Sequence, residues 1–409
     1  MTVKERQDYV ARTVGLSAAQ AEQLARPSNL DSELANHMIE NMISTISIPV
    51  GIATGVRVDG RDLLVPMATE EHWIIKAVCS AAELCQQNGG FRTSSSGSLM
   101  IAQIQLVDVP APYNARLAIL ENRDEIASIC NGADPTLVSF GGGFHDLEVR
   151  VLESTGAPMV ITHLIIDTRD AMGANTVNTM AERVAPLIAQ VTGGRPLLRI
   201  LSNLADRRLV RARAVWPLEA IGGESVRDAI IDAYRFAEAD PYRAVTNNKG
   251  TMNGISAVVL ATGNDTRAVE AGAHSYAARH GQIRSLTKWE VSSDGGLAGS
   301  IELPMAVGTV GGAVKIHPTA QALLAILAPD SAETLGRIIA AVGLAENFSA
   351  MKALATVGIQ NDFMALHAQT IAVSVGAVGP EVAQLTQALV NSGKINAAHA
   401  SVLLDELRN

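Results

Sequence analysis

The chain has 409 residues, of which 48% are hydrophobic, 18% are charged and only 3% are aromatic, and its formal net charge is −9. This length exceeds one ordinary hydrophobic core and predicts two or three domains. The acidic balance argues against nucleic-acid binding over a broad surface, although it leaves room for a local basic patch that binds a phosphate.

The cysteines Cys79, Cys85 and Cys130 have neither the spacing of metal ligands nor the number expected of a disulfide framework. We therefore expect reduced thiols, a cytoplasmic protein and no metal site. The sequence shows no run of about 18 apolar residues and no signal-peptide pattern at its start. It thus predicts no association with a membrane.

The first 96 residues predict a helical start, a β-hairpin and a further helix. Apolar and polar residues alternate from 48 to 65 about the turn Asp59-Gly60, which predicts the hairpin. Residues 70–87 are rich in alanine and carry apolar residues three and four apart, which is typical of a helix.

Residues 97–206 follow a different rhythm, in which strands and helices alternate as β-α-β-β-α-β. Strands are expected over 99–107, 147–152, 160–167 and 197–201, and helices over 113–131 and 176–191. This order is the split βαβ arrangement of ferredoxin-like domains. We therefore expect a small domain inserted into a larger one.

After residue 206 the pattern becomes helix-rich again. Helices are expected over 223–238 and 265–279, a hairpin over 286–303, and two or three helices after residue 358. The sequence therefore predicts an α+β protein. Its large domain would comprise 1–96 and 207–357, its inserted domain 97–206, and its C-terminal helical segment 358–409.

Two segments carry most of the chemical information. Residues 167–178 place small and amide side chains where a strand is expected to lead into a helix, as a site for an anionic cofactor requires. Residues 246–254 present Lys249 between amides and glycines, and Asp265 follows sixteen residues later. A lysine and an aspartate that meet in a buried site can tune each other's proton affinity.

These segments resemble the bacterial, class II 3-hydroxy-3-methylglutaryl-coenzyme A reductases, and the likeness extends in order and spacing over nearly the whole chain. Further matching segments are 38–44, 65–71, 88–96, 200–206 and 307–313. The resemblance implies an NAD(H)-dependent reductase of an acyl-CoA thioester, with hydroxymethylglutaryl-CoA and mevalonate as the first candidate pair in either direction. It also implies an obligate homodimer or an assembly of dimers, a dinucleotide-binding role for the inserted domain, and a flap role for the C-terminal helices.

The resemblance assigns catalysis to Lys249, Glu71 and Asp265. Lys249 would stabilise the oxyanion, Glu71 would protonate the aldehyde oxygen, and Asp265 would bridge the two. The residues alone leave alternatives open, because a lone lysine is usually a solvated charge and Glu70 is an equal candidate beside Glu71. A glutamate here could also complement a helix dipole. Asp265 precedes Thr-Arg-Ala-Val-Glu and makes a good helix N-cap, a role compatible with catalysis.

The cofactor residues implied by the resemblance cluster in and around 167–178. They are Asp170, Met172, Gly173, Asn175, Asn178 and Asn203. The Gly-x-Gly-x-x-Gly fingerprint is absent from the sequence. Asp134 matches an acid that contacts the adenosine ribose and would repel a 2′-phosphate, which favours NAD over NADP. A surface turn at Asp134-Pro135 is the alternative.

For the acyl-CoA substrate, the resemblance points to Arg243, Glu40 and Asn41. A guanidinium such as that of Arg243 can hold a carboxylate with two parallel hydrogen bonds. Glu40 and Asn41 lie in a segment that, in the family, reaches the active site across the dimer.

The chain departs from the family pattern at two places in the substrate site. Phe363 occupies the position of the flap histidine that protonates the thiolate of CoA, and His367 follows one helical turn later. Trp73 stands in place of a serine that contacts the substrate hydroxyl, and it fills additional volume. His72 and His367 are substitute imidazoles or ordinary surface histidines.

These departures keep two alternatives open. One is an oxidoreductase of the same family that acts on another acyl thioester or on an aldehyde. The other is a catalytically silent homologue that binds CoA or the dinucleotide. Turnover of NADH with hydroxymethylglutaryl-CoA, or of NAD with mevalonate and CoA, would distinguish the first candidate from both alternatives.

Overall fold

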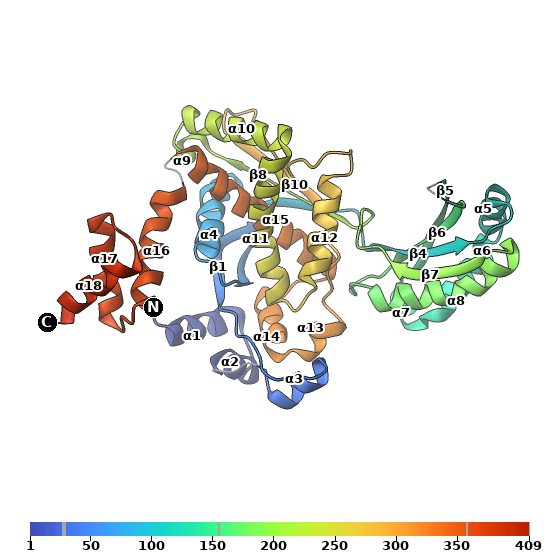
Figure 1. Cartoon of the computed structure of the whole chain (residues 1–409), viewed down its shortest axis with the longest axis horizontal. Helices are drawn as coiled ribbons and strands as arrows, with labels where there is room; N and C mark the ends of the chain where they lie inside the picture. Colours follow the sequence, from blue (N-terminus) through green and yellow to red (C-terminus); the bar gives the residue numbers. More distant parts are fainter. Residues whose placement is uncertain (27–29, 154–155, 357–358, 409) are drawn as a thin grey trace.

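The computed structural model describes residues 1–26, 30–153, 156–356 and 359–408, without the side chains of Ala313 and of residues 359–366. A large body lies at the centre, a small body at one end of the long axis, and a C-terminal body of helices at the other end (Figure 1). Each body has its own cluster of buried apolar side chains. This mixture of helices and sheets confirms the α+β class.

The large body contains a four-stranded antiparallel sheet in the order β3-β8-β10-β9 and a separate hairpin of β1 and β2. The strands are β1 (Val50–Val58), β2 (Arg61–Ala68), β3 (Arg92–Ser95), β8 (Leu209–Trp216), β9 (Thr287–Val291) and β10 (Leu297–Pro304). The hairpin turns at Asp59 and Gly60, which both have positive φ as a tight two-residue turn requires. Both expected hairpins are confirmed, whereas β8 lies where no strand is expected.

The helices of the large body surround and cross its core. They are α1 (Val3–Val14), α2 (Ala18–Ala25), α3 (Ser32–Met38), α4 (Ile74–Cys85), η1 (Gln86–Asn88), α9 (Leu218–Ile221), α10 (Glu224–Ala239), α11 (Pro241–Ala261), α12 (Thr266–Ala277), α13 (Gly312–Ile316), α14 (Pro318–Leu327) and α15 (Ala332–Ala355). Among the described residues, α15 alone has the length and apolar composition of a membrane span, and 67% of that stretch is buried inside the protein.

Two of these helices, α11 and α15, pack against each other in the core. A Cβ atom on Gly254 of α11 would lie 2.9 Å from the Cβ of Glu346 and 3.2 Å from the carbonyl oxygen of Val342, both on α15. Only glycine therefore allows this approach. The same contact fixes where the polar side chains of the two helices meet.

The small body has the expected ferredoxin-like topology. Its antiparallel sheet has the order β5-β6-β4-β7, and helices pack on it. Its elements are β4 (Leu99–Val107), α5 (Pro112–Glu121), α6 (Arg123–Ala133), α7 (Pro135–Ser139), β5 (Gly143–Leu152), β6 (Met159–Asp167), α8 (Ala174–Thr192) and β7 (Arg195–Leu201). The single helix expected over 113–131 is instead two helices. They meet at Asn122, whose backbone leaves the helical region and whose side chain bonds to the carbonyl of Ala118.

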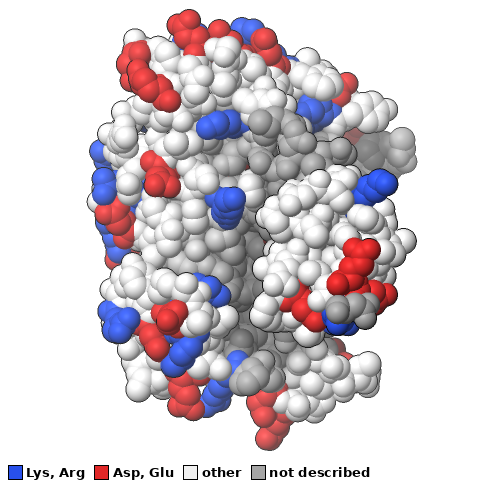
Figure 2. Space-filling model, turned by 90° about the vertical axis from the view of Figure 1, so that its left-hand side faces the viewer, with Lys and Arg blue, Asp and Glu red and all other residues white. Residues whose placement is uncertain are grey.

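The C-terminal body consists of α16 (Ile359–Ser374), α17 (Pro380–Ser392) and α18 (Ala397–Arg408). Arg408 closes it by donating two hydrogen bonds to the carboxylate of Glu381, and this contact lowers the pKa of Glu381 to about 2. The face in Figure 2 carries interspersed acidic and basic side chains and no broad area of one sign. Phe363 belongs to α16, but its side chain lies outside the described residues.

Candidate active site

Lys249 and Glu71 meet in a pocket of about 210 Å³ in the large body. Lys249 projects from α11, and its Nζ atom lies 3.1 Å from Oε2 of Glu71 in the loop between β2 and α4. The two side chains are 62% and 41% exposed, so water weakens the ion pair and both groups remain accessible to a substrate. Glu71 lines this pocket, whereas its neighbour Glu70 does not.

The loop that carries Glu71 is under backbone strain. Trp73 has φ 84° and ψ −30°, and α4 begins after it without a side-chain cap. Such a conformation is costly for a bulky side chain and persists where the surroundings impose it. Trp73 lines the pocket, and Nζ of Lys76 lies 4.2 Å from the centre of its ring. The tryptophan therefore takes up part of the volume beside Lys249 and Glu71.

His72 connects the pocket to the C-terminal body. Its Nε2 atom lies 3.1 Å from Oγ1 of Thr370 on α16. His367 is exposed on the same helix. The first helix after the large body thus touches the rim of the pocket through an imidazole.

Arg243 forms another wall of the pocket. Asp240 caps α11 by accepting a hydrogen bond from the backbone N–H of Arg243, and Nη2 of Arg243 lies 3.5 Å from Sδ of Met351. Burial lowers the pKa of Arg243, although an arginine remains charged at neutral pH. A guanidinium has five donors, so Arg243 can still bind a carboxylate in this pocket.

Glu346 is a site residue that the sequence analysis missed. It lies on α15, lines the same pocket and is only 6% exposed. Among the described residues, no hydrogen-bond partner reaches its Oε2 atom. Burial, and then the charge of Glu71, raises the pKa of Glu346 to about 8, against a smaller lowering by Lys249. The signal available in the sequence was a single carboxylate within the mostly apolar stretch 335–348, which indicates a buried acid.

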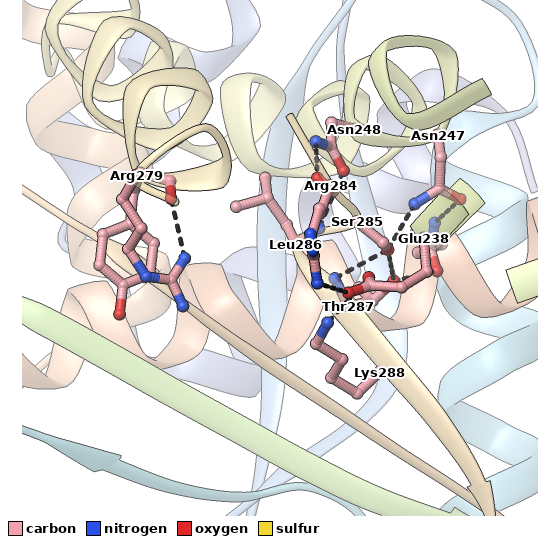
Figure 3. A network of polar contacts seen from close by, with 11 residues as sticks. Glu238, Asn247, Asn248, Arg279, Arg284, Ser285, Leu286, Thr287 and Lys288 are labelled. Atoms are coloured by element: carbon pink, nitrogen blue, oxygen red, sulfur yellow. Dashed lines mark hydrogen bonds and ion pairs between the residues drawn. The ribbon is translucent and has the colours of Figure 1, made fainter. Parts of the chain in front are cut away.

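Buried amides hold α11 in place behind Lys249. Asn247 donates to Oγ of Ser285 at 2.9 Å, and Asn248 both donates to the carbonyl of Arg284 and accepts from the N–H of Leu286 (Figure 3). The two asparagines that precede Lys249 are therefore structural, and they orient the exposed face of α11 toward the pocket.

Asn347, next to Glu346, joins this amide network to α15. Its Oδ1 atom accepts from Oγ1 of Thr287 at 2.8 Å and from Nε1 of Trp289 at 2.9 Å. Its Nδ2 atom donates to Oδ1 of Asn247 at 3.0 Å. Because the network is buried, it fixes Lys249 and Glu346 relative to each other.

A second pocket, of about 530 Å³, lies where the small body meets the large body. It is lined by Ala171, Met172, Gly173, Ala174, Asn175, Thr176, Gly263, Asn264, Asp265, Arg267, Gly308, Val310, Gly311, Gly312 and Val314. The helix α8 starts here after Gly173, with φ 99° and no side-chain cap, so its first N–H groups are available to an anion. This arrangement fits the pyrophosphate of a dinucleotide.

The other cofactor residues of the sequence analysis support this pocket from behind. Asp170 accepts a hydrogen bond from the N–H of Ala332 at the start of α15, and Asn178 accepts one from the N–H of Leu201. Asn203 is exposed outside the lining. Met172, Gly173 and Asn175 line the pocket directly.

Asp134 lies beside the first turn of α8. It caps α7 by accepting from the N–H of Leu137, and its Oδ2 atom accepts from Oγ1 of Thr176 at 3.2 Å. Because Thr176 lines the pocket, the carboxylate of Asp134 stands at its edge. The position suits contact with a ribose, and the alternative of a surface turn at Asp134-Pro135 is replaced by a helix cap.

Arg208 is a second residue that the sequence analysis missed. It is buried, and its guanidinium donates to Oγ1 of Thr168 and to the carbonyls of Ala171, Met172 and Val307. Burial lowers its pKa to about 10. Arg208 thereby fastens the loop before α8 to the large body, and no local pattern marks it.

Asp265 is the N-cap of α12, as expected, and accepts from the N–H groups of Arg267 and Ala268. Within the single chain it does not bridge Lys249 and Glu71. Lys249 precedes the end of α11 by twelve residues, or roughly 18 Å of helix, and Asp265 follows that end. It lines the pocket at α8 instead, together with Gly263 and Asn264, which also follow the end of α11.

Glu40 and Asn41 are exposed after α3 and contact neither pocket. The segment that follows them carries Ile43 and Ile46, which are 96% and 92% exposed. Isoleucines at such exposure are unusual on a monomer and typical of a surface that another chain covers.

The comparisons with known proteins agree with this geometry. The family model for hydroxymethylglutaryl-coenzyme A reductase matches residues 2–368. A 3-hydroxy-3-methylglutaryl-coenzyme A reductase of Archaeoglobus fulgidus is 49% identical over 409 residues, covering 100% of this chain and 93% of that protein. A probable reductase of the same name from Borreliella burgdorferi is 35% identical over 84% of this chain and 79% of its own length.

The chain belongs to the hydroxymethylglutaryl-coenzyme A reductase family. A solved class II 3-hydroxy-3-methylglutaryl-CoA reductase from Streptococcus pneumoniae, bound to NADPH in open conformations, superposes with a TM-score of 0.85 at 35% identity over 100% of both chains. The resemblance drawn from the sequence is confirmed. The protein is an oxidoreductase of this family, whose reaction reduces hydroxymethylglutaryl-CoA to mevalonate.

Proposed function

We propose that the protein interconverts hydroxymethylglutaryl-CoA and mevalonate with NAD(H), as a homodimer in the cytoplasm. The observation that carries this proposal is the contact between Lys249 and Glu71 in a pocket that also presents Arg243. A cation for developing negative charge, a carboxylate beside it and a guanidinium for the acyl carboxylate are what reduction of this thioester requires.

The chain's own residues would act as follows. Arg243 binds the carboxylate at the far end of the acyl group, which directs the reacting carbonyl oxygen toward Nζ of Lys249. The amine stabilises the negative charge on that oxygen when hydride adds to the thioester, and again when hydride adds to the aldehyde. Loss of CoA between these two steps yields the aldehyde and a thiolate. Glu71 keeps the amine oriented.

The pocket at α8 would hold the dinucleotide. The N–H groups after Gly173 bind the pyrophosphate, and Asp134 accepts hydrogen bonds from the ribose hydroxyls. A carboxylate at the edge of this pocket disfavours a 2′-phosphate, which supports NAD over NADP. When bound, the nicotinamide ring supplies or accepts the hydride.

The separation of the two pockets supports a dimer. Hydride transfer needs the reacting atoms about 3–3.5 Å apart, whereas the pocket at Lys249 lies along α11 and the pocket at α8 lies beyond the end of that helix. A second copy that brings its own pocket at α8, with Asp265, to the pocket at Lys249 resolves the distance. The exposed segment at Glu40, Asn41, Ile43 and Ile46 is then the surface that the copies share.

The three structural bodies and the buried thiols of Cys85 and Cys130 agree with the proposed function. We assign substrate binding and dimerisation to 1–96 and 207–357, dinucleotide binding to 97–206, and closure over the substrates to 358–409. Burial raises the pKa of Cys85 and of Cys130 to about 12, so both thiols stay protonated and unreactive, as suits a reducing compartment.

Steady-state kinetics test the proposal directly. We expect NADH oxidation with hydroxymethylglutaryl-CoA and NAD reduction with mevalonate plus CoA. Trp73 in the pocket favours a second candidate, an oxidoreductase of another acyl thioester or of an aldehyde, and turnover of only such substrates would establish it. Binding of CoA or NAD without turnover of any of them would show a silent homologue.

The double variant Trp73→Ser with Phe363→His distinguishes a protein with an intact active site and two changed positions from one whose active site has lost its function. If it gains reductase activity that the parent lacks, the scaffold is intact and only these two positions have changed. If neither protein transfers hydride in either direction, the assignment of Lys249 as an electrophile is wrong.

A further inference from the structure

We propose that Glu346 is the acid that protonates the substrate oxygen, and that Glu71 serves as the ion-pair partner of Lys249. This inference rests on the proposed function and assigns a catalytic role to a residue outside the family motifs identified in the sequence. It follows from the position of three charged side chains around one pocket.

The two glutamates occupy different environments in the same pocket. Glu71 is 41% exposed and pairs with Lys249 at 3.1 Å. Glu346 is 6% exposed, faces the same pocket from α15, and has an Oε2 atom without a hydrogen-bond partner among the described residues. Two carboxyl groups whose surroundings differ in this way divide into an ionised group and an acid.

The groups that face Glu346 come from each element around it. Glu71, in the loop before α4, raises its pKa, Lys249 on α11 lowers it, and burial has the largest effect, which together bring the value to about 8. Arg243 and His72 line the same pocket farther along its wall. The close packing at Gly254 holds the backbone of α11 against α15 at Glu346.

With Glu346 as the acid, every bond and proton in the reduction of the aldehyde is accounted for. Hydride adds to the aldehyde carbon, and the electron pair of the C=O bond moves to the oxygen. The O–H bond of Glu346 breaks and its proton goes to that oxygen, which gives the alcohol and leaves a carboxylate near Lys249. A proton from solvent restores Glu346 before the next turnover. Alcohol oxidation uses the same carboxylate as the base.

Oε2 of Glu346, which has no hydrogen-bond partner among the described residues, is available to a ligand. A buried carboxyl group with no partner costs stability unless a ligand completes it. In the proposed complex, the substrate oxygen is that partner.

The test compares the wild type with Glu346→Gln in the reduction of mevaldehyde, the aldehyde intermediate, by NADH. Glutamine keeps the shape but has no acidic proton, so kcat should fall by about 10²-fold or more, while KM and the Kd for NADH stay unchanged. The wild-type kcat should also decline at alkaline pH with an apparent pKa near 8, and the variant should lose this limb. Glu83→Gln, an exposed control on α4, should behave as the wild type.

Infrared spectroscopy gives a readout that does not depend on turnover. The wild type should show the band of a protonated carboxyl group at neutral pH, which disappears on alkaline titration and is missing in Glu346→Gln. If the wild type is active and Glu346→Gln matches its kcat and pH profile, or if the band is absent, the inference is overturned while the proposed function stands. If the wild type reduces neither hydroxymethylglutaryl-CoA nor mevaldehyde, both fail together.

Discussion

Nζ of Lys249 lies 3.1 Å from Oε2 of Glu71, although 178 residues separate the two in the chain. The contact joins the exposed face of α11 to the strained loop before α4. It thereby places a fixed positive charge in a pocket that a carboxylate and a guanidinium also line. The predictions below follow from this arrangement and from the second pocket at α8.

Replacing Lys249 with methionine removes the charge and keeps most of the volume. Because the amine stabilises an oxyanion in both reductions, kcat should fall by about 10²- to 10³-fold. The Kd for the dinucleotide should not change, since its pocket lies beyond the end of α11. Stopped-flow fluorescence of NADH and steady-state assays measure the two quantities. Lys394→Met, at an exposed site in the C-terminal body, is the control, and equal losses in both variants would contradict the role of Lys249.

The raised pKa of Glu346 makes stability depend on pH. In the folded state the pKa is about 8, above the ordinary 4.5 of an unfolded chain, so folding binds a proton between these values. The free energy of unfolding should therefore fall as pH rises through that window. Glu346→Gln removes this effect, so its advantage should grow from near zero at about pH 4 to several kcal/mol at about pH 9. Urea unfolding at both pH values measures it, and a constant difference would count against a protonated Glu346.

The amide network behind the pocket predicts a stability loss. Asn347→Leu leaves Oδ1 of Asn247, Oγ1 of Thr287 and Nε1 of Trp289 without their partner in a buried place. Each lost pairing costs about 1–3 kcal/mol, so the free energy of unfolding should fall by a few kcal/mol. Asn391→Leu on the exposed face of α17 should change it by about 0.5 kcal/mol or less. Equal effects in the two variants would show that the network adds nothing.

Asp134→Ser tests the choice of cofactor. Serine keeps an N-cap for α7 but carries no charge, so the 2′-phosphate of NADP is no longer repelled. The ratio of kcat/KM for NADPH over NADH should rise by about tenfold, which corresponds to ~1.4 kcal/mol. Asp146→Ser, on β5 outside the pocket, should leave the ratio as it is in the wild type. An unchanged ratio in Asp134→Ser would place the ribose elsewhere.

Much of the fold could be predicted because its signals are local. The turn Asp59-Gly60, the period-2 strands of the small body and the cap at Asp265 are short patterns, and each appears in the structure where it was expected. The strand β8 was not expected. It is paired on both sides within its sheet, and its partners β3 and β10 lie far away in the chain, so its identity depends on tertiary contacts.

The residues of the candidate site also divide into those that sequence motifs predict and those that only tertiary contacts define. Lys249 and Glu71 were identified from motif spacing, and the structure brings them together. Glu346 and Arg208 were missed because each acts through contacts made by distant segments across a helix pair or a domain boundary. Asp265 lines the pocket at α8 in the single chain. Its approach to Lys249 in the proposed dimer requires a second copy, which no single chain contains.

The central claim is that one active site combines Lys249 of one subunit with Asp265 and the dinucleotide pocket of another. Mixing the inactive variants Lys249→Met and Asp265→Asn after reversible dissociation tests it most directly. In a random mixture of dimers, half are hybrids and each hybrid has one intact site, so activity should recover to about one quarter of the wild type. A mixture that stays as inactive as its components, although hybrids are shown to form, would contradict the account.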